Sequence, residues 1–228
     1  MSDMFVAGLD LHAAVDAARR GGAVVVPRAL TDPFRRRLHS ELAELPFEPV
    51  PREVGPVLQE AEACTLRDLD PFPVLRSLVC EFGARVRTLG REPSDNGRAA
   101  IRGLATWRPN EFYVQRYRPG SLGITSHMDG RRYRRLIALF TACGWGRLTV
   151  RREREGEVLR RFPIRPGSLV MLRAPGLSGF RDARPFHAVE PLGRAERVSV
   201  GLRMDMRVAP SRASAGGPAA AVGLASGK

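Results

Sequence analysis

The second half of the sequence repeats one pattern that restricts the fold more than any other feature. From about Phe112 onward, short apolar or alternating segments follow one another, each separated from the next by turn residues. The expected strands cover residues 112–117, 136–142, 148–152, 158–162, 168–172, 186–189 and 198–204. Glu155-Gly156-Glu157 is typical of a hairpin tip. Many short strands at this spacing indicate a β-sandwich or a jelly roll.

Helices are expected before this strand-rich part. Segment 9–20 carries apolar residues at helical spacing and ends before Gly21-Gly22, which marks a helix stop. A short β-branched strand is expected at 23–26. Asp32 is expected to be the N-cap of a second helix, because its carboxylate can accept a backbone hydrogen bond. Pro33 then occupies the first turn, where its missing N–H costs nothing.

A third amphipathic helix is expected over 73–89, whereas 46–56 and 90–103 have the composition of loops. Together, these segments predict an α+β fold that is mostly β. Its core would be a double-stranded β-helix, the jelly roll, with the N-terminal helices packed on one side.

The length of 228 residues favours a single domain with enough chain to bury a core. We expect this domain to cover 1–208, with a helical and mixed part at 1–105 and the jelly-roll core at 106–208. The remaining stretch, 209–228, consists mainly of Ala, Gly, Ser and Pro and is expected to be a disordered tail.

Composition also restricts the setting in which the chain works. No apolar run reaches the ~20 residues needed to span a bilayer, and the N-terminus lacks the pattern of a secretory signal. A cytoplasmic protein without membrane contact is therefore expected. The cysteines Cys64, Cys80 and Cys143 are odd in number and form no C-x-x-C pair. This spacing argues against a disulfide framework or a structural zinc site and predicts reduced, mostly buried thiols.

The formal net charge of +13 favours an anionic partner such as nucleic acid. The only lysine is Lys228, and every other basic residue is an arginine. Together with the many Ala, Gly and Pro residues, this bias is typical of a GC-rich genome. The charge therefore supports an anionic partner only moderately.

One histidine-rich motif can bind a metal. His127-x-Asp129 is followed about sixty residues later by His187. Two imidazoles and one carboxylate form the facial ligand set of non-haem Fe(II) enzymes, which leaves positions open for oxygen and a co-substrate. Residues two apart on a strand or its extension point to the same side, so His127 and Asp129 can reach one ion. His12 and His39 have no such partner and are expected to be surface or structural residues.

Other metals remain possible for this ligand set. Zinc or manganese in a non-catalytic, cupin-like barrel would use the same residue types. A hydrolytic zinc enzyme would require a general base near the ion, and no motif in the sequence provides one.

A second motif, Arg197-x-Ser199-x-x-x-Arg203, points to the co-substrate. Its members are separated by even steps, so on one strand they share a face. Arginine offers a forked, permanently charged match to a carboxylate. Inward-pointing arginines without an anion would cost several kcal/mol each, by order of magnitude (~2–5). The alternative is an edge strand whose arginines point to water.

Several short motifs occur in a fixed order across residues 112–205. They are Gln115-Arg116-Tyr117-Arg118-Pro119-Gly120, His127-x-Asp129, Pro166-Gly167-Ser168-Leu169-Val170-Met171, His187 and Arg197-x-Ser199-x-x-x-Arg203. This order resembles the AlkB-like branch of the Fe(II)/2-oxoglutarate dioxygenases. The resemblance covers nearly half of the chain and is specific in the ligand and arginine motifs.

The resemblance implies a role for each matching position. The implied Fe(II) ligands are His127, Asp129 and His187. The implied 2-oxoglutarate contacts are Arg197, Tyr117 and Ser199 at the distal carboxylate, and Arg203 and Gln115 near the metal. Gln115 stands where the family usually has asparagine, and it keeps an amide that can donate and accept hydrogen bonds.

The implied chemistry is hydroxylation, with 2-oxoglutarate and O2 as co-substrates, or oxidative demethylation if the attacked carbon is bonded to nitrogen. AlkB-like repair enzymes act on alkylated bases extruded from the stack and tend to carry acidic residues after the ligand pair. Here the stretch 130–135 is rich in arginine. Arg131 could grip a phosphate or a carboxylate, and the alternative is a solvated basic loop. Trp107 could stack on a base, and the alternative is a core position.

Three hypotheses about function therefore remain open. The first is AlkB-like oxidation of alkylated nucleic acid bases. The second is hydroxylation of a small, anionic molecule such as an amino acid or natural product. The third is a basic nucleic-acid-binding barrel without catalysis.

Overall fold

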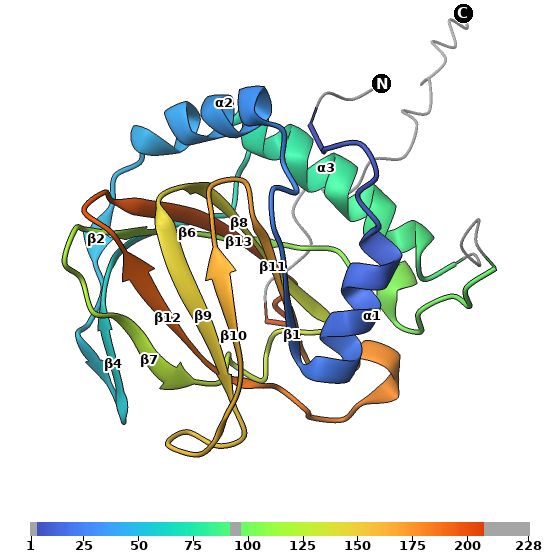
Figure 1. Cartoon of the computed structure of the whole chain (residues 1–228). Helices are drawn as coiled ribbons and strands as arrows, with labels where there is room; N and C mark the ends of the chain where they lie inside the picture. Colours follow the sequence, from blue (N-terminus) through green and yellow to red (C-terminus); the bar gives the residue numbers. More distant parts are fainter. Residues whose placement is uncertain (1–3, 92–96, 208–228) are drawn as a thin grey trace, which may run out of the picture.

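The computed structural model describes residues 4–91 and 97–207. In this part of the chain, two antiparallel sheets form the body and three α-helices gather on one side (Figure 1). The helices are α1 (Leu11–Gly21), α2 (Asp32–Ala43) and α3 (Pro73–Thr88), with short 3-10 turns η1 (Leu104–Thr106) and η2 (Leu177–Gly179).

The two sheets divide the strands almost equally. In order across the sheet, the larger contains β1 (Ala23–Val26), β11 (Leu169–Arg173), β8 (Leu136–Cys143), β13 (Arg197–Arg203), β6 (Glu111–Tyr117), β5 (Glu62–Leu66) and β2 (Glu48–Pro49). The smaller contains β10 (Val158–Ile164), β9 (Trp145–Arg151), β12 (Phe186–Leu192), β7 (Gly123–His127), β4 (Val57–Glu60) and β3 (Glu53–Val54). This arrangement confirms the expected mostly β, jelly-roll fold.

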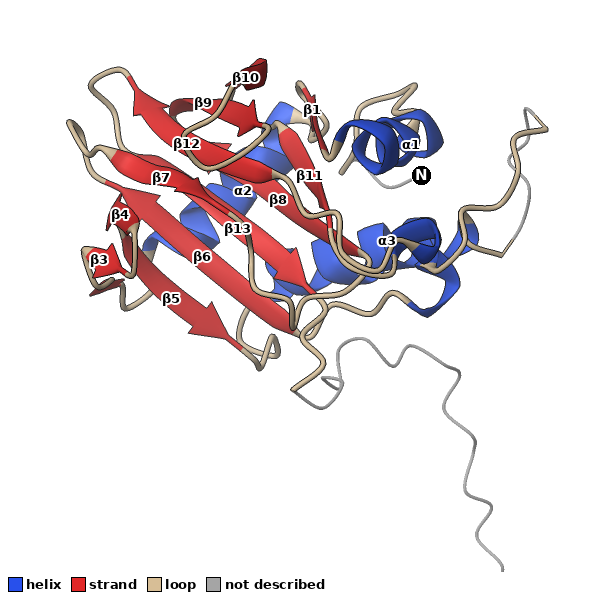
Figure 2. Cartoon of the chain, turned by 90° about the horizontal axis from the view of Figure 1, so that it is seen from below, coloured by secondary structure: helices blue, strands red, loops and turns tan. Residues whose placement is uncertain are grey.

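The helices cover the outer face of the larger sheet (Figure 2). Phe82 of α3 meets Phe140 of β8 edge to face, with ring centroids 5.0 Å apart. Leu38 and Leu42 of α2 and Leu78 of α3 are fully buried in the same cluster. Burial of these side chains at about 1.5–3 kcal/mol each holds the helices to the sheet.

Strict alternation along β13 decides which side chains face the barrel interior. Val198, Val200 and Leu202 belong to the core under the helices, so Arg197, Ser199 and Arg203 point the opposite way, between the sheets. The strand lies between β8 and β6. The alternative of an edge strand with solvated arginines is therefore wrong.

Several elements differ from the sequence-based expectations. Thr31, not Asp32, caps α2, and its hydroxyl accepts from the Phe34 N–H at 3.4 Å. The expected loop 46–56 contains the short strands β2 and β3, and the neighbouring β4 and β5 were not predicted. β4 and β5 form because the distant strands β7 and β6 offer them free edges. β3 then pairs with β4, and β2 pairs with β5.

The cysteines also differ from expectation in part. Cys64 and Cys143 are half-buried, but Cys80 is exposed on α3, so the prediction of buried thiols is wrong there. None of the described helices is long and apolar enough to cross a membrane. The expected tail, 209–228, lies outside the described residues, and so does part of the 90–103 loop.

Candidate metal centre and co-substrate pocket

His127 and His187 lie side by side on neighbouring strands. His127 ends β7, His187 follows the first residue of β12, and the two pair directly in register. Gly123 allows this approach, because a Cβ at its position would stand 2.0 Å from the Val189 carbonyl oxygen. The imidazole centroids are 4.3 Å apart. Tertiary pairing thus joins histidines that are sixty residues apart in the sequence.

Asp129 completes the group just beyond the end of β7. Its Oδ2 lies 3.5 Å from Nε2 of His187. One ligand atom from each of His127, Asp129 and His187 lies within 4.8 Å of the other two. The structure therefore brings together the three residues that the sequence singled out, in an arrangement that can hold one metal ion.

Backbone carbonyls fix the orientation of both rings. The oxygen of Thr125 lies 2.9 Å from Nδ1 of His127, and the oxygen of Pro185 lies 3.2 Å from Nδ1 of His187. A carbonyl accepts only, so each Nδ1 carries the proton and donates it. Each Nε2 then keeps its lone pair for a metal, which is the usual arrangement behind metal-binding histidines.

Charge in the group also suits a cation. Burial, aided by His127, lowers the pKa of His187 to about 4, so this ring is neutral at pH 7. Burial alone would raise the pKa of Asp129, but His187 and Arg203 outweigh it and hold that pKa below its ordinary value. Arg203 lies 3.9 Å from the Asp129 carboxylate. One anionic and one neutral ligand are thus ready at neutral pH.

Arg197 lies at the start of β13 and is 2% exposed. Its terminal nitrogens donate to the hydroxyls of Ser199 at 3.3 Å and Thr141 at 3.4 Å, and its Nε has no hydrogen-bond partner. No carboxylate within the described residues pairs with it. Burial lowers the pKa of Arg197, although not enough to neutralise a guanidinium. A buried cation without an anion indicates a site for an anionic ligand.

Tyr117 and Gln115 extend this end of the interior. Tyr117 pairs with Arg197 across the β6–β13 ladder, Gln115 pairs with Ser199, and the Arg197 guanidinium lies 5.5 Å from the Tyr117 ring centre. Burial raises the pKa of Tyr117 to about 12, so its phenol stays protonated and can donate. Thr141 was not predicted from the sequence, although alternation along β8 places it on the interior face.

Arg203 differs from Arg197 because carboxylates surround it. Glu111 lies 3.3 Å away, and the Tyr133 hydroxyl lies 3.4 Å away and donates to Glu111 at 2.7 Å. Burial alone would lower the pKa of Arg203, but Asp129, Tyr133 and Glu111 outweigh it and raise that pKa. No sequence pattern pointed to Glu111 or Tyr133, because antiparallel pairing and a distant loop bring them to Arg203.

A cavity of about 330 Å³ is lined by the metal-binding group, Arg203, Gln115 and Tyr117. Arg197 lies behind Tyr117, against its ring, and is not among the cavity residues. Further residues that line it include Gln59, Glu111, Tyr113, Met128, Arg132 and Tyr133. Aromatic rings, a carboxylate and a guanidinium therefore line the cavity around the metal-binding group.

Two residues expected at the substrate lie elsewhere. Trp107 is fully buried in the core, where its Nε1–H donates to the Leu136 carbonyl at 2.8 Å and its ring meets Phe82 edge to face. The prediction of a stacking platform is wrong because the ring faces α3. Arg131 has an 81% exposed side chain paired with Asp182 and is not among the cavity residues. Its neighbour Arg132 lines the cavity instead.

Comparison with known proteins shows which family of enzymes shares this fold. No protein-family model and no curated protein matches the chain. A Pseudomonas putida prolyl-4-hydroxylase structure matches with a TM-score of 0.56 at 21% identity, over 86% of this chain and 98% of that one. The chain has the fold of the Fe(II)/2-oxoglutarate oxygenases. The expected resemblance is thereby confirmed for the fold.

Two further oxygenase structures match with similar quality. One is a prolyl hydroxylase in complex with a hypoxia inducible factor peptide from Trichoplax adhaerens, with a TM-score of 0.54 at 18% identity, over 85% of this chain and 88% of that one. The other is OsALKBH1, with a TM-score of 0.54 at 14% identity, over 80% of this chain and 98% of that one. The same fold therefore occurs in proteins with quite different names.

The residues present fit the groups that this fold implies. Two imidazole nitrogens and one carboxylate match the facial set for Fe(II). Arg197, which has no carboxylate partner among the described residues, matches one carboxylate of a dicarboxylate such as 2-oxoglutarate. The arrangement can therefore place a chelated metal and a substrate in one cavity.

Proposed function

We propose that this protein is an Fe(II)- and 2-oxoglutarate-dependent dioxygenase. The observation that carries the proposal is the buried Arg197, which has no carboxylate partner among the described residues and lies in the same interior as the His127, Asp129 and His187 group. A dicarboxylate can chelate a metal with one end and pair with a guanidinium through the other. Such a ligand would therefore occupy both the metal-binding group and Arg197.

Each residue then has one task. His127, Asp129 and His187 hold the iron, which when bound supplies the oxidation of a C–H bond coupled to decarboxylation of 2-oxoglutarate. Arg197 pairs with the distal carboxylate, assisted by Tyr117, Ser199 and Thr141. Gln115 and Arg203 lie at the end near the metal, and Arg203 also orients Asp129. A zinc or manganese barrel without catalysis would leave Arg197 without an anion.

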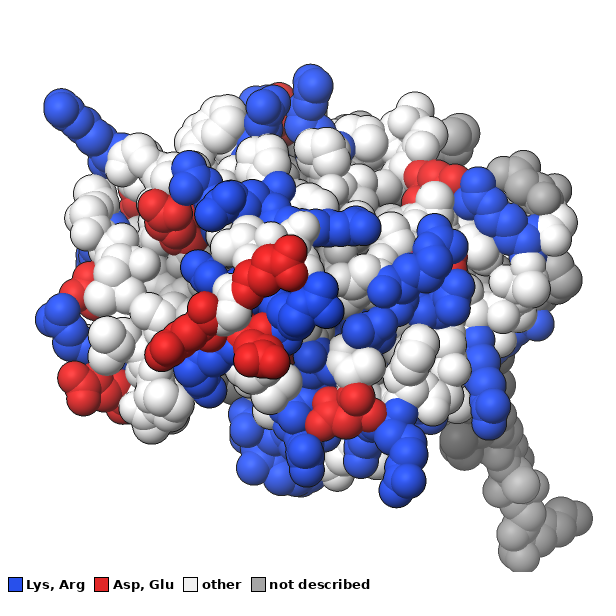
Figure 3. All heavy atoms as spheres, turned by 60° about the horizontal axis from the view of Figure 1, so that its bottom comes forward, with Lys and Arg blue, Asp and Glu red and all other residues white. Residues whose placement is uncertain are grey.

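For the substrate, we propose an N-alkylated nucleic acid base, with oxidative demethylation as the outcome. The net charge of +13 supports a polyanionic partner. Figure 3 shows arginine side chains spread, among carboxylates, over the face that includes the β9–β10 hairpin. Tyr113 and Tyr133 offer rings for a flipped base, and Glu111 offers a carboxylate for its exocyclic amino group.

A small anionic molecule is the second candidate. Arg132 supports it, because this guanidinium lines the cavity and can meet a carboxylate. Asp205 already pairs with Arg132 at 2.9 Å. A bound anion would therefore share the Arg132 guanidinium with Asp205.

The first experiment tests the metal and co-substrate sites. Metal-free protein is titrated anaerobically with Fe(II) and 2-oxoglutarate while the visible metal-to-ligand charge-transfer band of the chelate is recorded. We expect a band that is lost in His187→Ala and kept in His12→Ala, whose imidazole lies outside the site. No band and no binding in the parent protein would contradict the proposed function.

A second experiment separates the substrate classes. Binding of methylated oligonucleotides at increasing salt, and release of formaldehyde with iron and 2-oxoglutarate, are measured together. We expect salt-sensitive binding and formaldehyde formation. No binding at low salt would exclude nucleic acid, and turnover of a small carboxylate would then identify the second candidate.

A further inference from the structure

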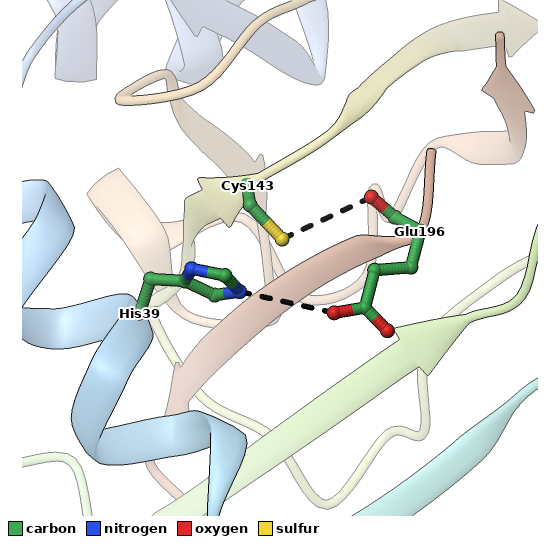
Figure 4. Close-up of side chains that lie close together, drawn as sticks. All are labelled: His39, Cys143 and Glu196. Carbon is green, nitrogen blue, oxygen red and sulfur yellow. Dashed lines mark hydrogen bonds and ion pairs between the residues drawn. The ribbon is translucent and has the colours of Figure 1, made fainter. Parts of the chain in front are cut away.

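A second group of metal-ligating side chains lies outside the cavity, at the end of the barrel that carries Arg197. His39 comes from α2, Cys143 ends β8, and Glu196 immediately precedes β13. Figure 4 shows the three side chains pointing toward one another from these separate elements. Nothing in the sequence predicted this convergence, and the proposed dioxygenase chemistry does not use it.

The distances leave room for one ion. Nε2 of His39 lies 3.9 Å from a carboxylate oxygen of Glu196, and one ligand atom from each residue lies within 4.8 Å of the others. Ligands of a tetrahedral Zn²⁺ at about 2.0–2.3 Å from the ion stand roughly 3.3–3.8 Å apart. The side chains of His39 and Glu196 are 34% and 38% exposed, so both can move the small remaining distance.

The atoms that face the centre of the group lack other strong partners. Nε2 of His39 is buried from solvent and makes no hydrogen bond. The Cys143 thiol donates a long bond, 3.8 Å, to the Glu196 carbonyl, and its sulfur accepts from the Val198 backbone N–H. Burial raises the pKa of this thiol, so it keeps its proton until a metal displaces it. One thiolate and one carboxylate would then neutralise the two charges of a divalent ion.

We propose that His39, Cys143 and Glu196 form a second metal site that binds Zn²⁺ through nitrogen, sulfur and oxygen. The thiolate distinguishes it from the oxygen- and nitrogen-based iron group, because soft sulfur ligands favour zinc. Three protein ligands leave a fourth, solvent-facing position for water. The absence of a C-x-x-C pair does not exclude this site, since its ligands come from separate elements.

Occupancy of this site would act on the segment that carries Arg197. Glu196 is adjacent to Arg197, and Cys143 pairs with Val198 on β13. The turn after Cys143 packs so closely that a Cβ on Gly144 would lie 2.3 Å from the Glu196 carbonyl oxygen. A bound ion would therefore tie α2 and this turn to the start of β13.

The test uses Co²⁺ as a spectroscopic substitute for Zn²⁺ in the full-length protein. His127→Ala/His187→Ala removes the iron group from the background, so the result does not depend on the proposed function. We expect one Co²⁺ per chain, an intense near-ultraviolet thiolate-to-cobalt band, and displacement by Zn²⁺. Cys143→Ser should abolish the band, whereas Cys80→Ser, which changes the exposed cysteine of α3, should keep it.

Two further variants protect the test from a folding artefact. His39→Ala and Glu196→Gln, introduced singly in the same background, should each weaken Co²⁺ binding at least about 10-fold. Their metal-free melting temperatures should stay close to that of the parent, because both side chains are partly exposed. A band that survives Cys143→Ser or is lost with Cys80→Ser, or unchanged affinity in the folded His39→Ala variant, would overturn the proposal.

Discussion

Replacement of Arg197 by methionine is expected to weaken co-substrate binding and to stabilise the co-substrate-free protein at the same time. Methionine has a similar length and no charge, so it can fill the space of the alkyl stem. The guanidinium is 2% exposed, and its only hydrogen bonds within the described part of the chain are the long ones to Ser199 and Thr141. Removing it takes away a buried charge that no carboxylate compensates.

The magnitudes follow from these contacts. A forked pairing of Arg197 with a carboxylate supplies two charge-assisted hydrogen bonds at about 1.5–3 kcal/mol each. Their loss corresponds to roughly 10²–10⁴-fold weaker binding of 2-oxoglutarate. Replacing a buried ionic group by an apolar side chain of similar volume stabilises by about 1–4 kcal/mol. Each kcal/mol raises the melting temperature of a chain of this size by about 2–4 °C.

The assay combines anaerobic 2-oxoglutarate titration with thermal unfolding of the ligand-free protein. Arg116→Met is the matched control, because Arg116 lies on the neighbouring strand β6 and pairs with Glu62 at 2.6 Å. We expect this control to bind 2-oxoglutarate normally and to gain no stability. Unchanged affinity in Arg197→Met would refute the co-substrate assignment. Destabilisation of the ligand-free variant would refute the claim that its charge is uncompensated.

Three further predictions test other parts of the site. Asp129→Ala should abolish succinate formation, while His12→Ala keeps it; turnover in the first variant would contradict the ligand assignment. Burial lowers the pKa of His187 to about 4, so the unfolded ring, with a pKa near 6.5, takes up a proton first as the pH falls. The metal-free protein should therefore lose about 2 kcal/mol of unfolding free energy between about pH 7 and 5, and urea titrations should show this loss to be absent in His187→Asn. Trp107→Phe should lower the free energy of unfolding by about 2–4 kcal/mol and leave the affinity for 2-oxoglutarate unchanged. Reduced affinity at unchanged stability would contradict the placement of Trp107 in the core.

Most strands that form the site could be predicted because their side chains alternate, but β7, which carries His127, was not among the expected strands. In β13, apolar Val198, Val200 and Leu202 alternate with polar Arg197, Ser199 and Arg203, and the observed strand follows that period. The small strands β2 to β5 could not be predicted, because they are short and show no clear alternation of polar and apolar residues. In addition, β4 and β5 depend on hydrogen bonds from the distant strands β7 and β6.

Residue identity and even spacing along single strands determined the mostly β fold, the three candidate metal ligands and the arginine pair. These features are local, since one strand fixes which side chains share a face. The tertiary structure alone decided which distant residues meet. His187 lies beside His127, Thr141 contacts Arg197, and Glu111 pairs with Arg203. Trp107 lies in the core. The tertiary structure also joined His39, Cys143 and Glu196. Contacts across a sheet depend on register and on packed helices, and neither is encoded in a short stretch of sequence.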